Sequence, residues 1–230
     1  MLYNLGMSGF AAPARHLATG ILPRDFYDRS VHAVARDLLG MILVRMPAAA
    51  PGCPGRLAGR IVEAEAYDGP DDLACHASKG RTERTDVMFG EAGHAYVYLV
   101  YGMHWCLNVV TGPVGYPAAV LIRALEPLEG RARMAPAGAR PGRIAAGPGR
   151  LTRAFRIELS LNRADLCAPG PLFIEAGDPP GAREVVRGAR IGVEYAGPWA
   201  RKRWRLGVRG SPALSRPFTT ARPAAARRRS

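Results

Sequence analysis

The stretch from Gly59 to Pro70 constrains the fold of this chain more than any other. Its sequence is Gly-Arg-Ile-Val-Glu-Ala-Glu-Ala-Tyr-Asp-Gly-Pro, and this alternation of residue types is typical of a β-strand. The pattern predicts Ile61, Glu63, Glu65 and Tyr67 on one face, and Val62, Ala64 and Ala66 on the other. An ionised carboxylate is costly to bury without a partner, so the face with both glutamates must either meet solvent or build a site.

A second stretch, residues 95–108, indicates that the glutamates build a site and do not simply face solvent. Three of the chain's eight tyrosines, Tyr96, Tyr98 and Tyr101, fall within six positions. Gly102 follows them directly, which indicates a tight turn between two strands. We therefore expect a β-hairpin of residues 96–101 and 105–110 that places aromatic rings beside the carboxylates.

One arginine also lies inside an apolar strand. Arg123 is in the strand predicted for residues 118–125, and an arginine in such a place needs an anionic partner. The glutamates of the first strand are the natural candidates. For Glu63 we expect a structural role, paired to a basic neighbour.

The rest of the pattern predicts an α+β fold. Apolar residues recur at helical spacing after Ser30 and stop at Gly40, and Gly147 opens a short helix that ends near Arg156. Short strands are expected at residues 41–44, 171–176, 190–195 and 204–208, a turn at 69–72, and an irregular basic surface at 131–150. Because strands outnumber helices and short turns join them, we expect a single compact domain with a curved, mainly antiparallel β-sheet and flanking helices.

Composition sets the domain boundaries that we expect. Residues 1–22 are predicted to be a disordered N-terminal extension, residues 23–214 the folded domain, and residues 215–230 a basic disordered tail rich in Pro, Ala and Arg. No apolar run reaches the ~18 residues that a membrane span needs.

The net charge of +13 and the isoelectric point near 10.4 favour a polyanionic partner. Nucleic acid or an acidic membrane surface would suit such a chain, and counterion release would make binding salt-dependent. The four cysteines, Cys53, Cys75, Cys106 and Cys167, form no Cys-x-x-Cys pair and have no histidine at ligand spacing. We expect no metal, and a cytoplasmic protein of a reducing compartment, the bacterial cytosol or nucleoid.

Several ordered blocks give the chain a specific resemblance. They are Arg60-Ile-Val-Glu-Ala-Glu-Ala-Tyr67, His76, Met88-Phe89, Tyr96-Val-Tyr98, Tyr101-Gly-Met103, Asn108 and Arg123-Ala-Leu-Glu-Pro127. In these blocks the chain resembles the alkyladenine (3-methyladenine) DNA glycosylase family, the type that includes the human enzyme. The resemblance covers roughly Arg24 to Pro212 and implies a compact domain with a protruding β-hairpin that enters DNA.

The resemblance implies a pocket for a base that has been flipped out of duplex DNA. Tyr67, His76 and Tyr98 are then the walls on which the base stacks, because aromatic faces stack on any base and favour an electron-poor, alkylated one. Asn108 resembles the steric gate that clashes with the exocyclic amine of guanine.

The resemblance also implies the catalytic and inserting residues. Glu65 resembles the general base that activates the attacking water, and Arg123 the group that orients the water and the target nucleotide. Tyr101, at the hairpin tip, resembles the residue that fills the gap left by the flipped nucleotide.

Contacts to the DNA backbone are expected from two places in the chain. The polar loop after His76 carries Lys79, Arg81 and Arg84, which are expected to contact phosphates beside a tyrosine-lined site. Gly147 and Arg150 lie at a helix amino end, where backbone N–H groups favour anions.

The mechanism that we expect is hydrolysis without a cofactor or metal, by a monomer that acts on double-stranded DNA and leaves an abasic site. Glycosylases that nick the backbone need an amine nucleophile, and no lysine lies near the motif strand. The sequence leaves the preferred lesion open.

Two other functions would use much of the same composition. A non-catalytic nucleic-acid binding protein could stack single strands on the tyrosines, but Glu65 would repel phosphate. A purine nucleoside hydrolase could use the same pocket, but it would not need a charge of +13.

Overall fold

The computed structural model describes residues 20–47, 55–135 and 138–218. The strands are β1 Ile42–Arg45, β2 Leu57–Asp68, β3 Ala95–Val100, β4 His104–Thr111, β5 Ala118–Glu129, β6 Leu172–Glu175, β7 Val185–Gly188 and β8 Arg205–Val208. The α-helices are α1 Arg24–Tyr27, α2 Val31–Asp37, α3 Arg131–Met134 and α4 Pro148–Phe155. The 3-10 helices are η1 His76–Lys79, η2 Asp86–Phe89, η3 Pro141–Arg143, η4 Leu159–Leu161, η5 Ala182–Glu184 and η6 Glu194–Arg201.

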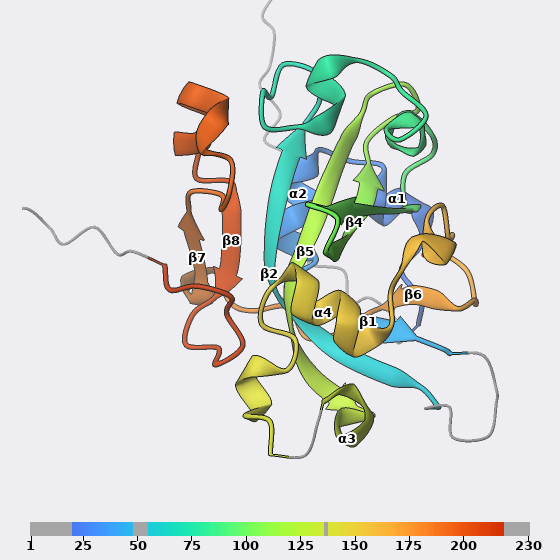
Figure 1. Ribbon diagram of the computed structural model, residues 1–230, viewed down its shortest axis with the longest axis vertical. Helices are drawn as coiled ribbons and strands as arrows, with labels where there is room; N and C mark the ends of the chain where they lie inside the picture. Colours follow the sequence, from blue (N-terminus) through green and yellow to red (C-terminus); the bar gives the residue numbers. More distant parts are fainter. Residues whose placement is uncertain (1–19, 48–54, 136–137, 219–230) are drawn as a thin grey trace, which may run out of the picture.

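Within these residues the chain forms one open antiparallel sheet of eight strands, which confirms the α+β class (Figure 1). The main order is β3-β4-β5-β2-β1-β6, and β8 joins β2 while pairing with β7 on its other side. The long central strand β2 therefore has β5 along one edge and two short partners, β1 and β8, along the other. This position puts the motif strand in the middle of the sheet.

A β-bulge at Val62 changes the faces that the sequence predicts for β2. Ile61 pairs with Leu125 and Glu63 with Ala124, so Val62 is the extra residue. Ile61 consequently packs in the main core with Ala64 and Ala66, whereas Val62 packs in a separate cluster with Ala124. The predicted faces are thus wrong for Ile61 and Val62.

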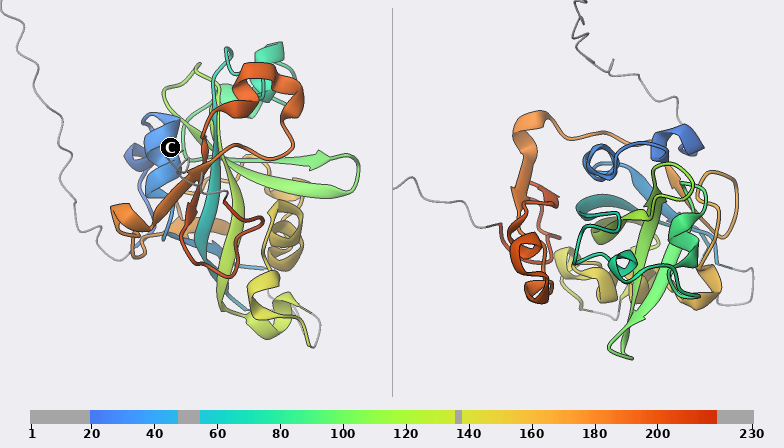
Figure 2. Two further views of the ribbon diagram at one scale, coloured as in Figure 1. Left: turned by 90° about the vertical axis from the view of Figure 1, so that its left-hand side faces the viewer. Right: turned by 90° about the horizontal axis from the view of Figure 1, so that it is seen from above.

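The core lies between the sheet and the helices that cover it. Helix α2 packs on β2 and β5, and α4 packs on β4 and β5. In the left view of Figure 2 these two helices lie on opposite sides of the sheet, while the β3–β4 hairpin protrudes on the side of α4. Gly59 is needed in β2 because an added Cβ would lie 2.9 Å from the Phe155 ring.

The segment after residue 189 differs from the expectation. Residues 190–195 were predicted as a strand, but residues 190–193 form a loop and residues 194–195 begin η6. The prediction is wrong because Gly192 has a φ of 76° and ends any extended run. Strand β7, which the sequence pattern did not indicate, lies just before this loop.

The ends of the described chain bear on the expected domain boundaries. Residues 1–19 of the predicted extension and 219–230 of the predicted tail lie outside the described residues. Ser215 and Phe218 are described, and both pack against the domain, Ser215 on Glu63 and Phe218 on Arg205. In the described ranges, no helix has the length and apolar character to cross a membrane.

Candidate active site

A cavity of about 470 Å³ lies at the base of the protruding hairpin. Its walls come from the end of β2, from η1, from β3, β4 and β5, from the start of α4 and from the loop before η6. The predicted residues that line it are Tyr67, His76, Arg84, Tyr98, Tyr101, Asn108 and Arg123. Its volume is within the range of about 300–1,000 Å³ that small-molecule pockets occupy.

Glu65 lies directly behind the cavity wall and is fully buried. Its Oε2 accepts hydrogen bonds from the Tyr67 hydroxyl at 3.0 Å and from Arg123 at 3.2 Å. Its Oε1 accepts a bond from the Ile191 backbone N–H at 2.9 Å. All three donors belong to residues that line the cavity, so the carboxylate contacts the wall from behind.

These contacts set the ionisation of the site. Burial raises the pKa of Glu65, an effect that Arg123, the Ile191 N–H and the Tyr67 hydroxyl oppose. Burial and the neighbouring Glu65 hold the pKa of Tyr67 well above its ordinary value, so its hydroxyl keeps its proton and can donate. The pKa of Glu65 is raised overall, so the effect of burial outweighs that of the three donors.

Glu63 is fully buried as well, but it faces other partners. It accepts hydrogen bonds from Arg123 at 3.1 Å, from Arg205 at 3.3 Å, and from the backbone N–H and hydroxyl of Ser215 at 2.6 and 2.7 Å. The predicted pairing of Glu63 with basic neighbours is confirmed, and so is the pairing of Arg123 with both carboxylates. Arg123 therefore joins the two glutamates and fixes their relative position.

Aromatic rings also line the cavity. The His76 ring lies edge-on to Tyr98, with centroids 4.5 Å apart, and its Nδ1 is 2.9 Å from the Tyr96 hydroxyl oxygen. Arg84 covers one side of Tyr98, with its guanidinium carbon 4.9 Å from the ring centroid. Burial, together with the charges of Arg84 and Lys79, lowers the pKa of His76 to about 4. The imidazole is therefore neutral at physiological pH.

Asn108 lies in the middle of β4, where it is nearly buried. Its Nδ2 donates to the backbone carbonyl of Tyr96 at 3.1 Å, on the neighbouring strand. This bond orients the side chain where it lines the cavity. Asn108 lies inside the strand and not at a turn, where Asn commonly satisfies backbone groups.

Tyr101 occupies the tip of the hairpin and is 84% exposed. Tyr101 and Gly102 both have positive φ values, 51° and 67°, and the Met103 N–H bonds to the Val100 carbonyl. Two consecutive left-handed residues suit the twist of a tight hairpin, but this conformation is uncommon for a tyrosine. The tip thus holds a large exposed ring in a backbone conformation that is costly for it.

The residues that were predicted to bind the DNA backbone differ in their surroundings. Arg84 lines the cavity, whereas Arg81 forms an ion pair with Asp86 at 2.6 Å, and Lys79 is exposed at the end of η1 away from the cavity wall. Gly147 precedes α4, whose first residue, Pro148, lines the cavity. Arg150 is exposed two residues further along that helix.

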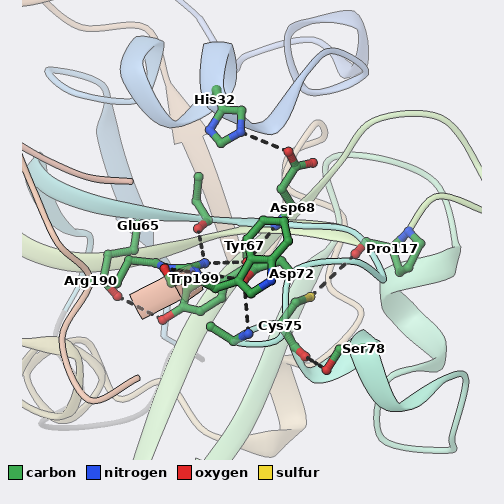
Figure 3. A network of polar contacts seen from close by, with 12 residues as sticks. His32, Glu65, Tyr67, Asp68, Asp72, Cys75, Ser78, Pro117, Arg190 and Trp199 are labelled. Carbon is green, nitrogen blue, oxygen red and sulfur yellow. Dashed lines mark hydrogen bonds and ion pairs between the residues drawn. The ribbon is translucent and has the colours of Figure 1, made fainter. Parts of the chain in front are cut away.

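Sequence reasoning missed the group that supports Tyr67 from behind. Arg190 stacks between the rings of Tyr67 and Trp204, with its guanidinium carbon 4.7 and 4.9 Å from their centroids. Asp72 pairs with Arg190 through both carboxylate oxygens, and both side chains are fully buried. Figure 3 shows Arg190 and Asp72 beside Tyr67 and Glu65.

Little in the sequence could have signalled this group. Asp72 belongs to a Gly-Pro-Asp-Asp run that is typical of an exposed turn, and Arg190 lies 118 residues away. The one available signal was the arginine inside a predicted apolar strand, which requires an anionic partner just as Arg123 does.

The sequence profile of methylpurine-DNA glycosylase (MPG) matches residues 25–212. The chain belongs to this family. Relatives that carry the provisional name 3-methyladenine DNA glycosylase include proteins from Methanocella arvoryzae at 54% identity over 200 residues and Myxococcus xanthus at 51% over 195 residues. These alignments cover 85% of this chain and 96% and 93% of the relatives. A Legionella pneumophila relative is 45% identical over 195 residues, which are 85% of this chain and 98% of its own length.

The family assignment makes the chain a DNA glycosylase, a hydrolase of DNA repair, and sets aside both alternative functions. The match spans the glutamate strand, the hairpin and the cavity, which therefore belong to one enzyme domain. In the described part of this glycosylase, no group of three or more His, Cys, Asp or Glu side chains could hold a metal ion.

Proposed function

We propose that this glycosylase takes alkylated or deaminated purines flipped out of duplex DNA and hydrolyses their N-glycosidic bond, leaving an abasic site. The substrates would include 3-methyladenine and 7-methylguanine, with hypoxanthine and etheno-adenine as further candidates. The observation that carries the proposal is Glu65, a buried carboxylate held by three donors directly behind the cavity wall.

Glu65 has the hydrogen-bonding capacity that a general base needs. A carboxylate offers about four acceptor positions, and the three donors leave one on Oε1. A water at that position would give its proton to Glu65 as its oxygen attacks the sugar carbon, while the bond to the base breaks and the base leaves. Arg123 would orient this water and the nucleotide, because it both contacts Glu65 and lines the cavity.

The aromatic walls suit an alkylated purine. Tyr67, His76 and Tyr98 all line the cavity, and a base between them would stack on electron-rich faces. Because His76 is neutral at physiological pH, it would not repel a base that alkylation has made cationic.

The lysines of the chain support simple hydrolysis without backbone nicking. Lys79 is exposed at the end of η1, and Lys202 lies over the rings of Trp199 and Trp204. Neither lines the cavity, so neither is placed to attack the sugar as a Schiff-base nucleophile. We propose that the enzyme works as a monomer in the cytoplasm, where its cysteines would stay reduced.

The direct test is to incubate the protein with methylated duplex DNA and measure the free bases and the strand. Release of 3-methyladenine with an intact, alkali-labile strand, equally with and without EDTA, supports the proposal. No free base, or a nicked strand without alkali, would refute it.

Replacing Tyr101 with alanine should shift the flipping equilibrium more than it weakens overall binding. The exposed ring at the hairpin tip would fill the space of the flipped nucleotide, whereas phosphate contacts would supply most of the affinity. A fluorescent base analogue reports flipping, and anisotropy reports binding. The exposed Met103→Ala at the same tip is the matched control, and an unchanged flipping equilibrium in the Tyr101 variant would remove the wedge role.

Replacing Asn108 with serine should widen the substrate range toward guanine. The amide is held by its bond to Tyr96, and a clash of about 1–3 kcal/mol with the guanine amino group corresponds to roughly 5-fold to 150-fold selectivity. Single-turnover rates on matched duplexes should show the guanine-to-hypoxanthine ratio rising by about that factor. An unaltered ratio in a folded variant would contradict the gate.

The rate of base release should fall at low pH through protonation of Glu65 alone. Because burial raises the pKa of Glu65 above its ordinary 4.5, activity should be lost as pH falls through that raised pKa. With its pKa lowered to about 4, His76 should add no step near its usual 6.5. Single-turnover rates across pH on a hypoxanthine duplex measure this acidic limb of the pH–rate profile. A step near 6.5 that vanishes in His76→Gln would overturn the assignment.

A further inference from the structure

More than half of the net charge lies in one short segment. Residues 131–157 contain seven arginines and no acidic residue, so they contribute +7 of the chain's +13. The arginines are Arg131, Arg133, Arg140, Arg143, Arg150, Arg153 and Arg156. Such a concentration of one sign on a small surface is an electrostatic footprint for a polyanion.

These arginines are free to bind. All seven are exposed, and none of them forms an ion pair with another residue in the described ranges. Arginines elsewhere behave differently: Arg24, Arg56 and Arg163, for example, pair with carboxylates at 2.6–2.8 Å. The positive charge of the segment is therefore not neutralised within the described fold.

Four of the seven surround a hollow of about 530 Å³ between α3, η3 and α4. Arg133, Arg143, Arg150 and Arg153 line it, over a floor that includes Met134, Ile144 and Ala154. We call this feature the arginine hollow. A guanidinium presents paired N–H donors that match phosphate oxygens, so four of them around one hollow suit a phosphate chain better than a single small acid.

The arginine hollow lies next to the active site. Helix α4 begins at Pro148 on the active-site cavity, and its Arg150 and Arg153 line the hollow. At 1.5 Å per residue, Arg153 is about 8 Å along the helix from Pro148. In the left view of Figure 2, the protruding hairpin, α4 and the segment with η3 and α3 follow one another along the same side of the molecule.

We propose that the arginine hollow is a second DNA-binding site, which holds backbone phosphates of the duplex beside the damaged nucleotide. The inference rests on the proposed function, because a nucleotide in the cavity and Tyr101 in the groove bring the flanking duplex along α4. Phosphates of one strand advance 3.4 Å along the axis, so an offset of about 8 Å corresponds to roughly two or three nucleotides.

The test compares two triple variants with the same loss of charge. The first is Arg133→Gln/Arg143→Gln/Arg153→Gln in the hollow. The matched control is Arg36→Gln/Arg183→Gln/Arg187→Gln, three exposed arginines on α2, η5 and β7, away from the hollow. Thermal melting checks that both fold. Because all six side chains are exposed, both variants should melt near the wild type.

Salt dependence of binding to a lesion-containing duplex gives the main readout. Each lost phosphate contact lowers the slope of log Kd against log salt by about 0.9, so the hollow variant should lose roughly 2 to 3 in slope. The control variant should keep the wild-type slope. Equal slopes in both variants, whether unchanged or reduced together, would overturn the proposal, since specific contacts would then not exist.

Single methylphosphonate replacements locate the contacts. Neutralising a phosphate about two or three nucleotides from the lesion should weaken wild-type binding and leave the hollow variant's binding unchanged. The same loss in both proteins would place that phosphate elsewhere and refute the assignment. When the hollow variant is present at saturating concentration, its single-turnover rate of base release should equal that of the wild type. A failure of the second DNA-binding site can therefore be told apart from a failure of the proposed glycosylase activity.

Discussion

Replacing Glu65 with glutamine is expected to lower the single-turnover rate of base release by about 10²–10⁴ while DNA binding stays within a few-fold of wild type. The amide cannot accept the proton of the attacking water. We expect phosphate contacts to dominate affinity, and Glu65, which is fully buried, would take no part in them. Rates at saturating enzyme on a 3-methyladenine duplex, with anisotropy for binding, measure both quantities.

Glu63→Gln is the matched control. Both glutamates are fully buried on the same strand and both contact Arg123. The other partners of Glu63 are Arg205 and Ser215, which do not line the cavity, whereas those of Glu65 are Tyr67 and Ile191, which do. Breaking a buried ion pair costs about 3–5 kcal/mol, so this variant should lose stability to urea while its folded fraction keeps near-normal rates. An equal loss of rate in both variants would mean that Arg123 couples the glutamates, and that Glu65 alone is not the base.

The periodic parts of the fold could be predicted from the sequence. The alternation in β2, the tyrosine-rich hairpin and the stop at Gly40 each depend on neighbours within a few residues. The bulge at Val62 could not be predicted, because it arises where β2 exchanges β1 for β8 as its edge partner. The alternation of residues 190–195 suggested a strand, but the backbone turns at Gly192.

The same division holds in the active site. The resemblance identified Glu65, Tyr67, His76, Asn108 and Arg123, and the structure gathers them around one cavity. It could not supply the Ile191 N–H that bonds to Glu65, since any residue except proline could donate this backbone hydrogen bond. Contacts of this kind follow from tertiary geometry and leave no compositional signal.

Arg190 connects the two features that sequence reasoning missed. It precedes Ile191, whose N–H bonds to Glu65, and its side chain stacks behind Tyr67, whose hydroxyl bonds to the same carboxylate. Asp72 holds the guanidinium in place from the other side. Arg190 should therefore be a positioning residue for two of the three donors that surround Glu65.

Replacing Arg190 with methionine should destabilise the protein by about 3–5 kcal/mol, because it leaves the buried Asp72 carboxylate without its partner. The double variant Arg190→Met/Asp72→Asn removes both charges, so urea denaturation should show most of that stability restored. If the stability losses of Arg190→Met and Asp72→Asn, measured separately, simply add in the double variant, then loss of the ion pair is not the cause of the destabilisation.

The double variant then isolates the positioning role. Without Arg190, no guanidinium stacks on the Tyr67 ring, and residue 190 no longer holds the neighbouring Ile191 backbone through its ion pair with Asp72. Both donors should therefore bond less well to Glu65. Those two bonds hold the pKa of Glu65 below the value that burial alone would give. Weakening them should raise the pKa of Glu65 further and move the acidic limb of base release to higher pH. A role limited to stability would leave that limb where it is in the wild type, because Arg123 and the burial of Glu65 are unchanged. Single-turnover rates across pH, for wild type and double variant on the same hypoxanthine duplex, decide between these outcomes.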